Sequence, residues 1–208
     1  MSQIKLKHSG GNSVIIAAPD SNPASDRTLK LPSDGDGTIL TTNSSVGKLL
    51  QVVSTTKTDT FSQSSLNDST YSNDTGLNVT ITPSSSSNKI RLSGSVVVSM
   101  DVDNSAIAIV LFKDGSVVTG ALGSSNGNRT PCMSMTMLGN YGNECETLPF
   151  DFLHTAGGTS ATTYGIRIMF FDGSVSSSTV YMNRTQSSDN YVYRPLAIST
   201  ITAMEVAG

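Results

Sequence analysis

The most reactive pair that the sequence offers is Asp151 with His154, a carboxylate three positions before a histidine. With a serine nearby, such a pair could form a hydrolase triad. Serine is so abundant in this chain that the coincidence carries almost no information, and no Gly-x-Ser-x-Gly elbow presents one as a nucleophile. We therefore interpret Asp151 as a polar strand residue and His154 as a loop histidine, and we expect no enzyme activity.

Glu144 and Glu146 form the sole Glu pair, and carboxylate pairs are the groups that cleave glycosidic bonds. In a strand, the two side chains would share a face about 7 Å apart. A loop flanked by a cysteine explains the pair equally well, so we assign it no catalytic role.

The cysteines, Cys132 and Cys145, lie thirteen positions apart. A disulfide across a hairpin or loop is geometrically possible, but no secretory signal is visible, which favours free, buried thiols. Zinc needs about four nitrogen or sulfur ligands, and the two histidines, His8 and His154, fall in different parts of the chain. We expect no zinc site.

Two short acidic clusters, Asp34 with Asp36 and Asp101 with Asp103, are similar to the first residues of calcium loops. Neither is followed by a Glu at the twelfth loop position. Aspartates in turns hydrogen-bond their own backbone, which accounts for both clusters. The sequence thus predicts no metal and no cofactor.

The amino-acid composition excludes further functional classes of protein. The 208 residues include 34 Ser and 24 Thr, while only 14% are charged, against roughly 25% in an ordinary soluble protein. A net charge of −3 with 13 Lys and Arg does not provide the excess of positive charge that binding to nucleic-acid phosphates requires. No apolar run approaches the ~18 residues of a membrane span, so we expect no membrane insertion.

The elements that carry these residues are predicted by alternation of apolar and polar side chains, which indicates strands with one buried face. The predicted inward residues are Leu77, Val79, Ile81, Ile90, Leu92, Val96, Val98, Met100, Tyr164, Ile166, Ile168 and Phe170. In the last segment, Leu196, Ile198, Met204 and Val206 are expected on one face. Met133, Met135 and Met137 alternate in the same way and predict an adaptable packing face.

Turns punctuate these strands. Asp114-Gly115 and Asp172-Gly173 stand between strand-like runs and predict tight hairpins. Roughly eight to ten strands are expected between residue 48 and the C-terminus. The prediction is an all-β protein in which residues 48–208 form an antiparallel, jelly-roll-like β-sandwich head.

Residues 1–47 are different, because short apolar pieces alternate there with Gly- and Pro-containing turns. Such a segment cannot close a core alone and needs a partner. We interpret it as an N-terminal β-arm for trimerisation and attachment, with its boundary near residues 43–47.

Several segments resemble bacteriophage tail fibres of the type common in phages of marine bacteria and cyanobacteria. The resemblance rests on Ile4–Asn12, Ala18–Pro23, Arg27–Pro32 and Gly37–Thr42 in the arm, and on Gly47–Val53, Thr75–Ser84, Thr159–Tyr164 and Ser199–Val206 in the head. Residues 101–146 carry no part of this resemblance, and such fibres vary most where they meet the host.

This resemblance implies a non-enzymatic virion tail fibre or receptor-binding protein that forms a homotrimer. It implies attachment to phage tail or baseplate proteins, binding to a host surface polysaccharide or outer-membrane protein, and assembly in the host cytoplasm. One alternative is a structural virion protein, a capsid decoration or tail collar component, that binds no receptor. A polysaccharide-degrading tailspike is a weaker alternative, because acidic residues are few.

Host contact is expected at the polar loops between strands, which adapt while the strands stay fixed. These loops are residues 123–130, 139–146, 172–178 and 186–193. The planar and aromatic side chains suited to sugar or protein surfaces are the candidates: Asn126, Asn128, Arg129, Tyr141, Tyr191 and Tyr193.

Overall fold

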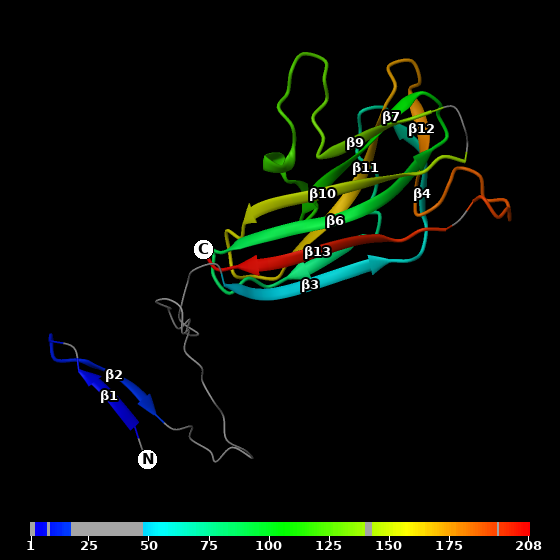
Figure 1. The fold of residues 1–208 in the computed structure, drawn as a ribbon. Helices are drawn as coiled ribbons and strands as arrows, with labels where there is room; N and C mark the ends of the chain where they lie inside the picture. Colours follow the sequence, from blue (N-terminus) through cyan, green and yellow to red (C-terminus); the bar gives the residue numbers. More distant parts are fainter. Residues whose placement is uncertain (1–2, 8, 18–47, 140–142, 195) are drawn as a thin grey trace, which may run out of the picture. The chain divides into compact units, whose positions relative to one another are not determined.

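The computed structural model describes residues 3–7, 9–17, 48–139, 143–194 and 196–208 (Figure 1). The chain divides into two compact units, Met1–Asn43 and Ser44–Gly208. The predicted boundary at residues 43–47 lies outside the described residues, as do Asp34, Asp36 and His8.

The described part of the first unit is a single antiparallel hairpin. Strands β1 (Gln3–Lys7) and β2 (Ser13–Ala17) pair from Gln3↔Ala17 to Lys7↔Ser13. Gly11 in the turn has φ +103°, a conformation that suits glycine. Ile4 and Leu6 share one face of β1 and are 61% and 59% exposed. The hairpin therefore presents apolar side chains that it does not bury itself.

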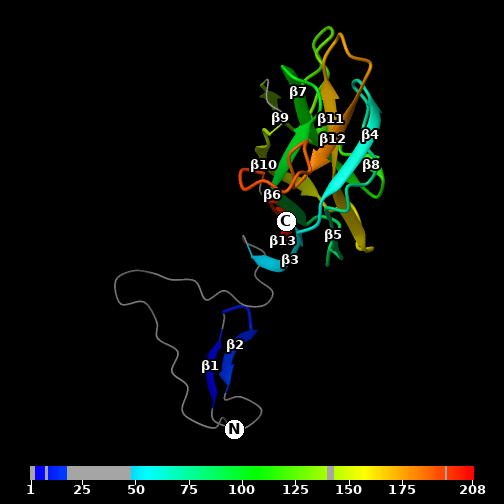
Figure 2. The same cartoon turned by 90° about the vertical axis from the view of Figure 1, so that its right-hand side faces the viewer.

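The second unit is a sandwich of two antiparallel sheets, which confirms the predicted fold class (Figures 1 and 2). Its described residues hold eleven strands, slightly more than expected, and one short 3₁₀ helix, η1 (Thr119–Ala121). The six-stranded sheet consists of β3 (Leu49–Lys57), β4 (Phe61–Asn67), β6 (Lys89–Met100), β10 (Glu146–Thr155), β12 (Ser177–Met182) and β13 (Ser199–Val206). The five-stranded sheet consists of β5 (Asn78–Ile81), β7 (Ser105–Lys113), β8 (Ser116–Val117), β9 (Ser134–Leu138) and β11 (Thr162–Phe171).

β6 organises the six-stranded sheet. It pairs with β10 from Lys89 to Val98 on one side, while its other side pairs with β13 from Lys89 to Ser95 and with β12 from Val98 to Met100. In the five-stranded sheet, β7 lies between β11 and the two short strands β8 and β9. No helix among the described residues is long and apolar enough to cross a membrane.

The main core lies between the sheets, and most of the predicted inward residues line it. The buried residues that were predicted are Leu77, Val79, Ile81, Ile90, Leu92, Val96, Val98, Met100, Tyr164, Ile166, Ile168 and Phe170. Alternation therefore identified the inner face of β5, β6 and β11 correctly.

The predicted face of the last strand was wrong. In β13 the buried residues are Ser199, Ile201, Ala203 and Glu205, whereas Leu196 and Ile198 precede the strand and are exposed. Ala203 stands opposite the core residue Leu92 on β6, so the ladder turns the odd-numbered side chains inward. Glu205 is tolerated there because it accepts hydrogen bonds from Asn88 Nδ2 and from the Ser84 backbone N–H, both at 2.6 Å.

A second, smaller core covers the outer face of the five-stranded sheet. Val110, Phe112 and Met169 are buried there beneath Leu122, Cys132 and neighbouring residues of the chain between β8 and β9. Met169 alternates with the predicted inward residues of β11 and so faces the other side of the sheet, and this cover explains why it is buried. Of the three methionines expected to pack, Met133 packs against the main core, whereas Met135 and Met137 of the edge strand β9 are exposed.

The two Asp-Gly turns have different roles. Asp114 and Gly115 adopt φ +48° and +79° and join β7 to β8, so this predicted hairpin is confirmed. Asp172-Gly173 instead joins β11 to β12, which belong to different sheets, so the hairpin predicted there was wrong. The Asp172 carboxylate accepts the backbone N–H groups of Ser174 and Val175, which curls the chain between the sheets.

Candidate functional site

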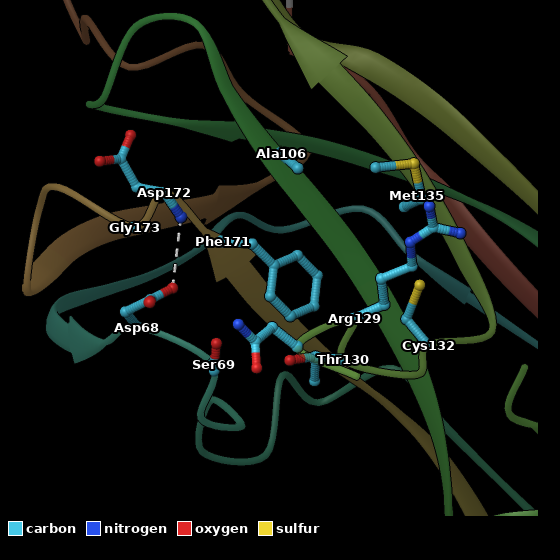
Figure 3. A pocket seen from close by; sticks show the side chains of 11 residues that line it. Asp68, Ser69, Ala106, Arg129, Thr130, Cys132, Met135, Phe171, Asp172 and Gly173 are labelled. Carbon is cyan, nitrogen blue, oxygen red and sulfur yellow. Dashed lines mark hydrogen bonds between the residues drawn. The ribbon is translucent and has the colours of Figure 1, made fainter. Parts of the chain in front are cut away.

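Two of the four predicted loops, residues 123–130 and 172–178, project from the same side of the sandwich (Figures 1 and 2). Together with the turn after β4 they enclose a hollow of about 370 Å³ (Figure 3). Its walls are Asp68, Ser69, Ala106, Asn128, Arg129, Thr130, Cys132, Met135, Phe171, Asp172 and Gly173. This loop hollow combines one aromatic ring with hydroxyl, amide and guanidinium groups.

A tight turn places Asn128 and Arg129 at this hollow. The Arg129 backbone N–H donates to the Asn126 carbonyl at 3.1 Å, and Gly127 supplies φ +59°. Figure 3 shows the Arg129 side chain beside Cys132 and reaching toward Met135. Asn126 itself does not line the hollow, so only two of the three predicted residues of this loop meet there.

Asp172 lines the hollow and stabilises the loop that carries it. Its carboxylate accepts hydrogen bonds from the hydroxyls of Ser105 and Ser174 and from two backbone N–H groups. The hydrogen bond from Ser105 has the largest effect, and together these bonds hold the pKa of Asp172 well below its usual range. The carboxylate is therefore ionised and engaged in fixing its loop.

A second site is formed by Tyr191 and Tyr193, whose rings stack with centroids 5.5 Å apart and an interplanar angle of 16°. The two tyrosines are 55% and 57% exposed, and Val192 between them is 97% exposed. The Arg194 guanidinium lies 5.2 Å from the Tyr191 ring and 5.6 Å from the Tyr193 ring. We call these four residues the tyrosine platform.

Arg194 anchors the platform to the sandwich. Its side chain is only 14% exposed and donates to Asp189 Oδ2 at 2.7 Å and to the Ser187 hydroxyl. Its Nε donates to Asn143 Oδ1 at 2.6 Å, which ties the platform to the loop before β10. A planar guanidinium that is held at several points fixes the rings above it at low entropic cost.

The structure therefore brings predicted residues together in two places. Asn128 and Arg129 share the loop hollow, and Tyr191 and Tyr193 share the platform, while Tyr141 lies outside the described residues. Sequence reasoning missed Arg194 and Asn143, which position the platform. An arginine directly after Tyr-x-Tyr was a usable signal for the first, whereas Asn143 is distant in sequence.

The groups first considered for catalysis are kept apart. Asp151 lies on the outer face of β10, where it accepts hydrogen bonds from Arg91 Nε at 3.0 and 3.1 Å. His154 Nδ1 instead lies 2.9 Å from the hydroxyl of Tyr164, a buried residue of the main core. Strand alternation turns the two side chains to opposite faces, so they cannot act as a pair.

The other candidates have local structural contacts. Glu144 accepts the Gly139 backbone N–H at 2.6 Å, and Asp101 accepts the Ser178 hydroxyl at 2.7 Å. Cys132 and Cys145 are free and half-buried, and burial raises the pKa of both thiols. Among the described residues, no group of three or more His, Cys, Asp or Glu side chains is placed to hold a metal ion.

No family model matches the chain, and no curated protein is similar to it. Similar solved structures come from infectious bursal disease virus. The Gx strain structure is 14% identical with a TM-score of 0.39, covering 76% of this chain and 37% of that chain. The Gt strain structure is 15% identical with a TM-score of 0.39, covering 95% of this chain and 48% of that chain.

A third similar structure, the VP2 subviral particle of the same virus, is 14% identical with a TM-score of 0.36. It covers 76% of this chain and 38% of that one. This chain thus spans less than half the length of each of the three.

Proposed function

We propose that the protein is a non-enzymatic tail fibre protein of a phage virion, which binds the host cell surface through the loops of its sandwich. The observation that carries this proposal is the tyrosine platform. Tyr191, Val192 and Tyr193 present apolar surface to solvent, on a loop fixed by a largely buried arginine. Exposed aromatic side chains with polar tips are the residues that binding surfaces favour.

A loop that is held in one conformation favours binding of a partner. A loop ordered before contact loses less conformational entropy on binding, so a small contact area yields more affinity. The loop hollow with Arg129 and Asn128 offers hydrogen-bonding groups on another part of the same unit. Both sites suit a host surface polysaccharide or an outer-membrane protein.

The N-terminal arm supports a role in assembly. Ile4 and Leu6 present an apolar face that the hairpin leaves exposed, and a second or third copy would remove that face from water. We propose a homotrimer joined through residues 1–47, which also attach to tail or baseplate proteins. Three copies would multiply weak single contacts with the host. Sedimentation of the full chain is expected to give a trimer, and a monomer at micromolar concentration would contradict it.

A second candidate is a capsid decoration or tail collar protein that binds no receptor. It is favoured by exposed apolar side chains on the outer face of the six-stranded sheet, where the exposed Val52 and Leu153 flank Met204 and Arg91 in one cross-strand row. Such a row could pack on another virion protein.

Labelling of this protein on intact virions separates the two candidates. Gold-labelled antibodies viewed by electron microscopy should mark the tail tip if the protein is a fibre. Label spread over the capsid shell, or confined to the collar, would support the second candidate and overturn the first.

A further inference from the structure

The proposed function makes no use of a second hollow, which is lined by the only histidine among the described residues. It measures about 270 Å³ and lies between the β7–β8 hairpin, the η1 turn and strand β10. Its lining consists of Lys113, Ser116, Val117, Val118, Thr119, Gly120 and His154. Ligand pockets start at roughly 300 Å³, so an occupant must be small.

The protonation pattern of His154 follows from its neighbour Tyr164. Burial, and then the charge of Asp114, raises the pKa of Tyr164 to about 12, so its hydroxyl keeps its proton. That hydroxyl lies 2.9 Å from His154 Nδ1 and can donate to it. When the Tyr164 hydroxyl donates to Nδ1, the neutral imidazole carries its own proton on Nε2. No residue in the described part of the chain bonds Nε2, so a donor remains available on a side chain that lines the hollow.

Positive charge surrounds this donor. Lys113 lines the same hollow, and its ammonium group donates to the Ala156 carbonyl at 3.1 Å, which leaves two of its three donors. Lys89 on the adjacent strand β6 donates to the Thr155 hydroxyl at 2.8 Å. Neither lysine takes part in an ion pair within the described ranges.

These charges act on the histidine. Burial is the main cause that lowers the pKa of His154, and the charges of Lys113 and Lys89 lower it further. The titratable groups around it are thus Lys113 from β7, Lys89 from β6 and Tyr164 from β11, with Asp114 acting on the tyrosine. An excess of cations and donors without an acidic partner at the histidine is an environment that attracts an anion.

We propose that this hollow binds the carboxylate of a small organic acid. The carboxylate accepts from His154 Nε2 and the Lys113 ammonium, the hydroxyls of Ser116 and Thr119 bond its neighbouring polar groups, and Val117 and Val118 contact its apolar side. The site does not depend on the host-binding role of the tyrosine platform.

Proton linkage gives the site a pH signature. A bound carboxylate favours the protonated imidazole and raises the pKa of His154, so binding takes up a proton. Affinity is therefore expected to rise as the pH falls through the pKa that His154 has in the complex.

The test is a titration of the full-length protein, labelled at histidine, with glucuronate as the probe, followed by NMR of the ring signals. Glucose, which lacks the carboxylate, and inorganic sulfate are titrated in parallel. Glucuronate should shift the His154 signal saturably and bind at least about tenfold more tightly than glucose. Equal effects of glucose and glucuronate, or no shift of His154 at any pH, would overturn the proposal. A response to sulfate alone would also overturn it, in favour of an inorganic anion site.

Three variants sharpen the result. Lys113→Gln removes one charge from the hollow and should weaken glucuronate binding about tenfold. Arg91→Gln removes the same charge from the outer face of β6 and should leave the affinity within about twofold. His154→Gln keeps a neutral donor and should abolish the pH dependence while some binding persists, which keeps the test decisive if Lys113→Gln does not fold. Equal affinities for the parent and Lys113→Gln would contradict the assignment.

Discussion

The two sheets of the sandwich share one core, but their outer faces differ: one is largely covered by other parts of the chain and the other is exposed. The outside of the five-stranded sheet is covered over its central strands, so every residue of β7 from Ser105 to Phe112 is buried. The six-stranded sheet leaves its outside open, with Leu153 55% exposed and Arg91 paired to Asp151 in solvent. The covered sheet can contribute stability from both faces, whereas the open one keeps a surface that a partner could use.

The shared core carries the largest expected effect. Phe170 of β11 is fully buried between the sheets, so Phe170→Ala should lower the free energy of unfolding by about 3–5 kcal/mol. Thr163, on the opposite face of the same strand, only exchanges an exposed hydrogen bond with Thr80, so Thr163→Ala should cost well under that. Urea unfolding of both variants measures the difference, and equal costs would refute the assignment of faces.

The comparison between the sheets is tested by outward-facing residues. Met169→Ala on the covered sheet should cost about 2–5 kcal/mol, because the side chain is buried in the second core. Leu153→Ala on the open sheet should change stability by no more than about 0.5 kcal/mol. Thermal unfolding of the two variants measures both changes in stability. A large loss for Leu153→Ala would mean that the open face is already covered by another copy.

These positions also show how far sequence reasoning reaches. Alternation placed Tyr164 to Phe170 correctly, because that face is apolar throughout. It failed for Met169 and for β13, because it cannot tell whether a distant segment covers the other face or which partner sets the register. Ile201 and Ala203 face inward through their pairing with β6, although Met204 and Val206 are equally apolar.

A smaller effect is expected from the buried carboxylate of Glu205. Burial alone would raise its pKa, but hydrogen bonds from Asn88 and Ser84 outweigh burial and hold the pKa below the ordinary value of 4.5. Glu205 thus contributes stability that is fully present above pH 4.5 and is lost as the pH falls through the lowered pKa of the folded state.

Glu205→Gln should lower stability at neutral pH by about 1–3 kcal/mol and flatten the loss of stability below pH 4.5. Chemical denaturation across that acid range compares the variant with the parent. Parallel pH profiles would show that Glu205 does not carry the linkage.

The candidate site was predictable only in part. Loop composition pointed to Tyr191, Tyr193, Asn128 and Arg129, because polar and aromatic residues gather where strands end. The anchoring of Arg194 by Asn143 and Asp189 depends on which loops fold side by side, and this is a property of the tertiary structure.

Host attachment through the tyrosine platform is tested most directly by competition between purified protein and phage for adsorption to host cells. The parent protein should block adsorption, and the double variant Tyr191→Ala/Tyr193→Ala should lose that effect while its melting temperature stays unchanged. Ala substitution of Tyr71, another exposed tyrosine of the sandwich, serves as the matched control and should leave competition intact. Competition by the double variant at the level of the parent would contradict the account.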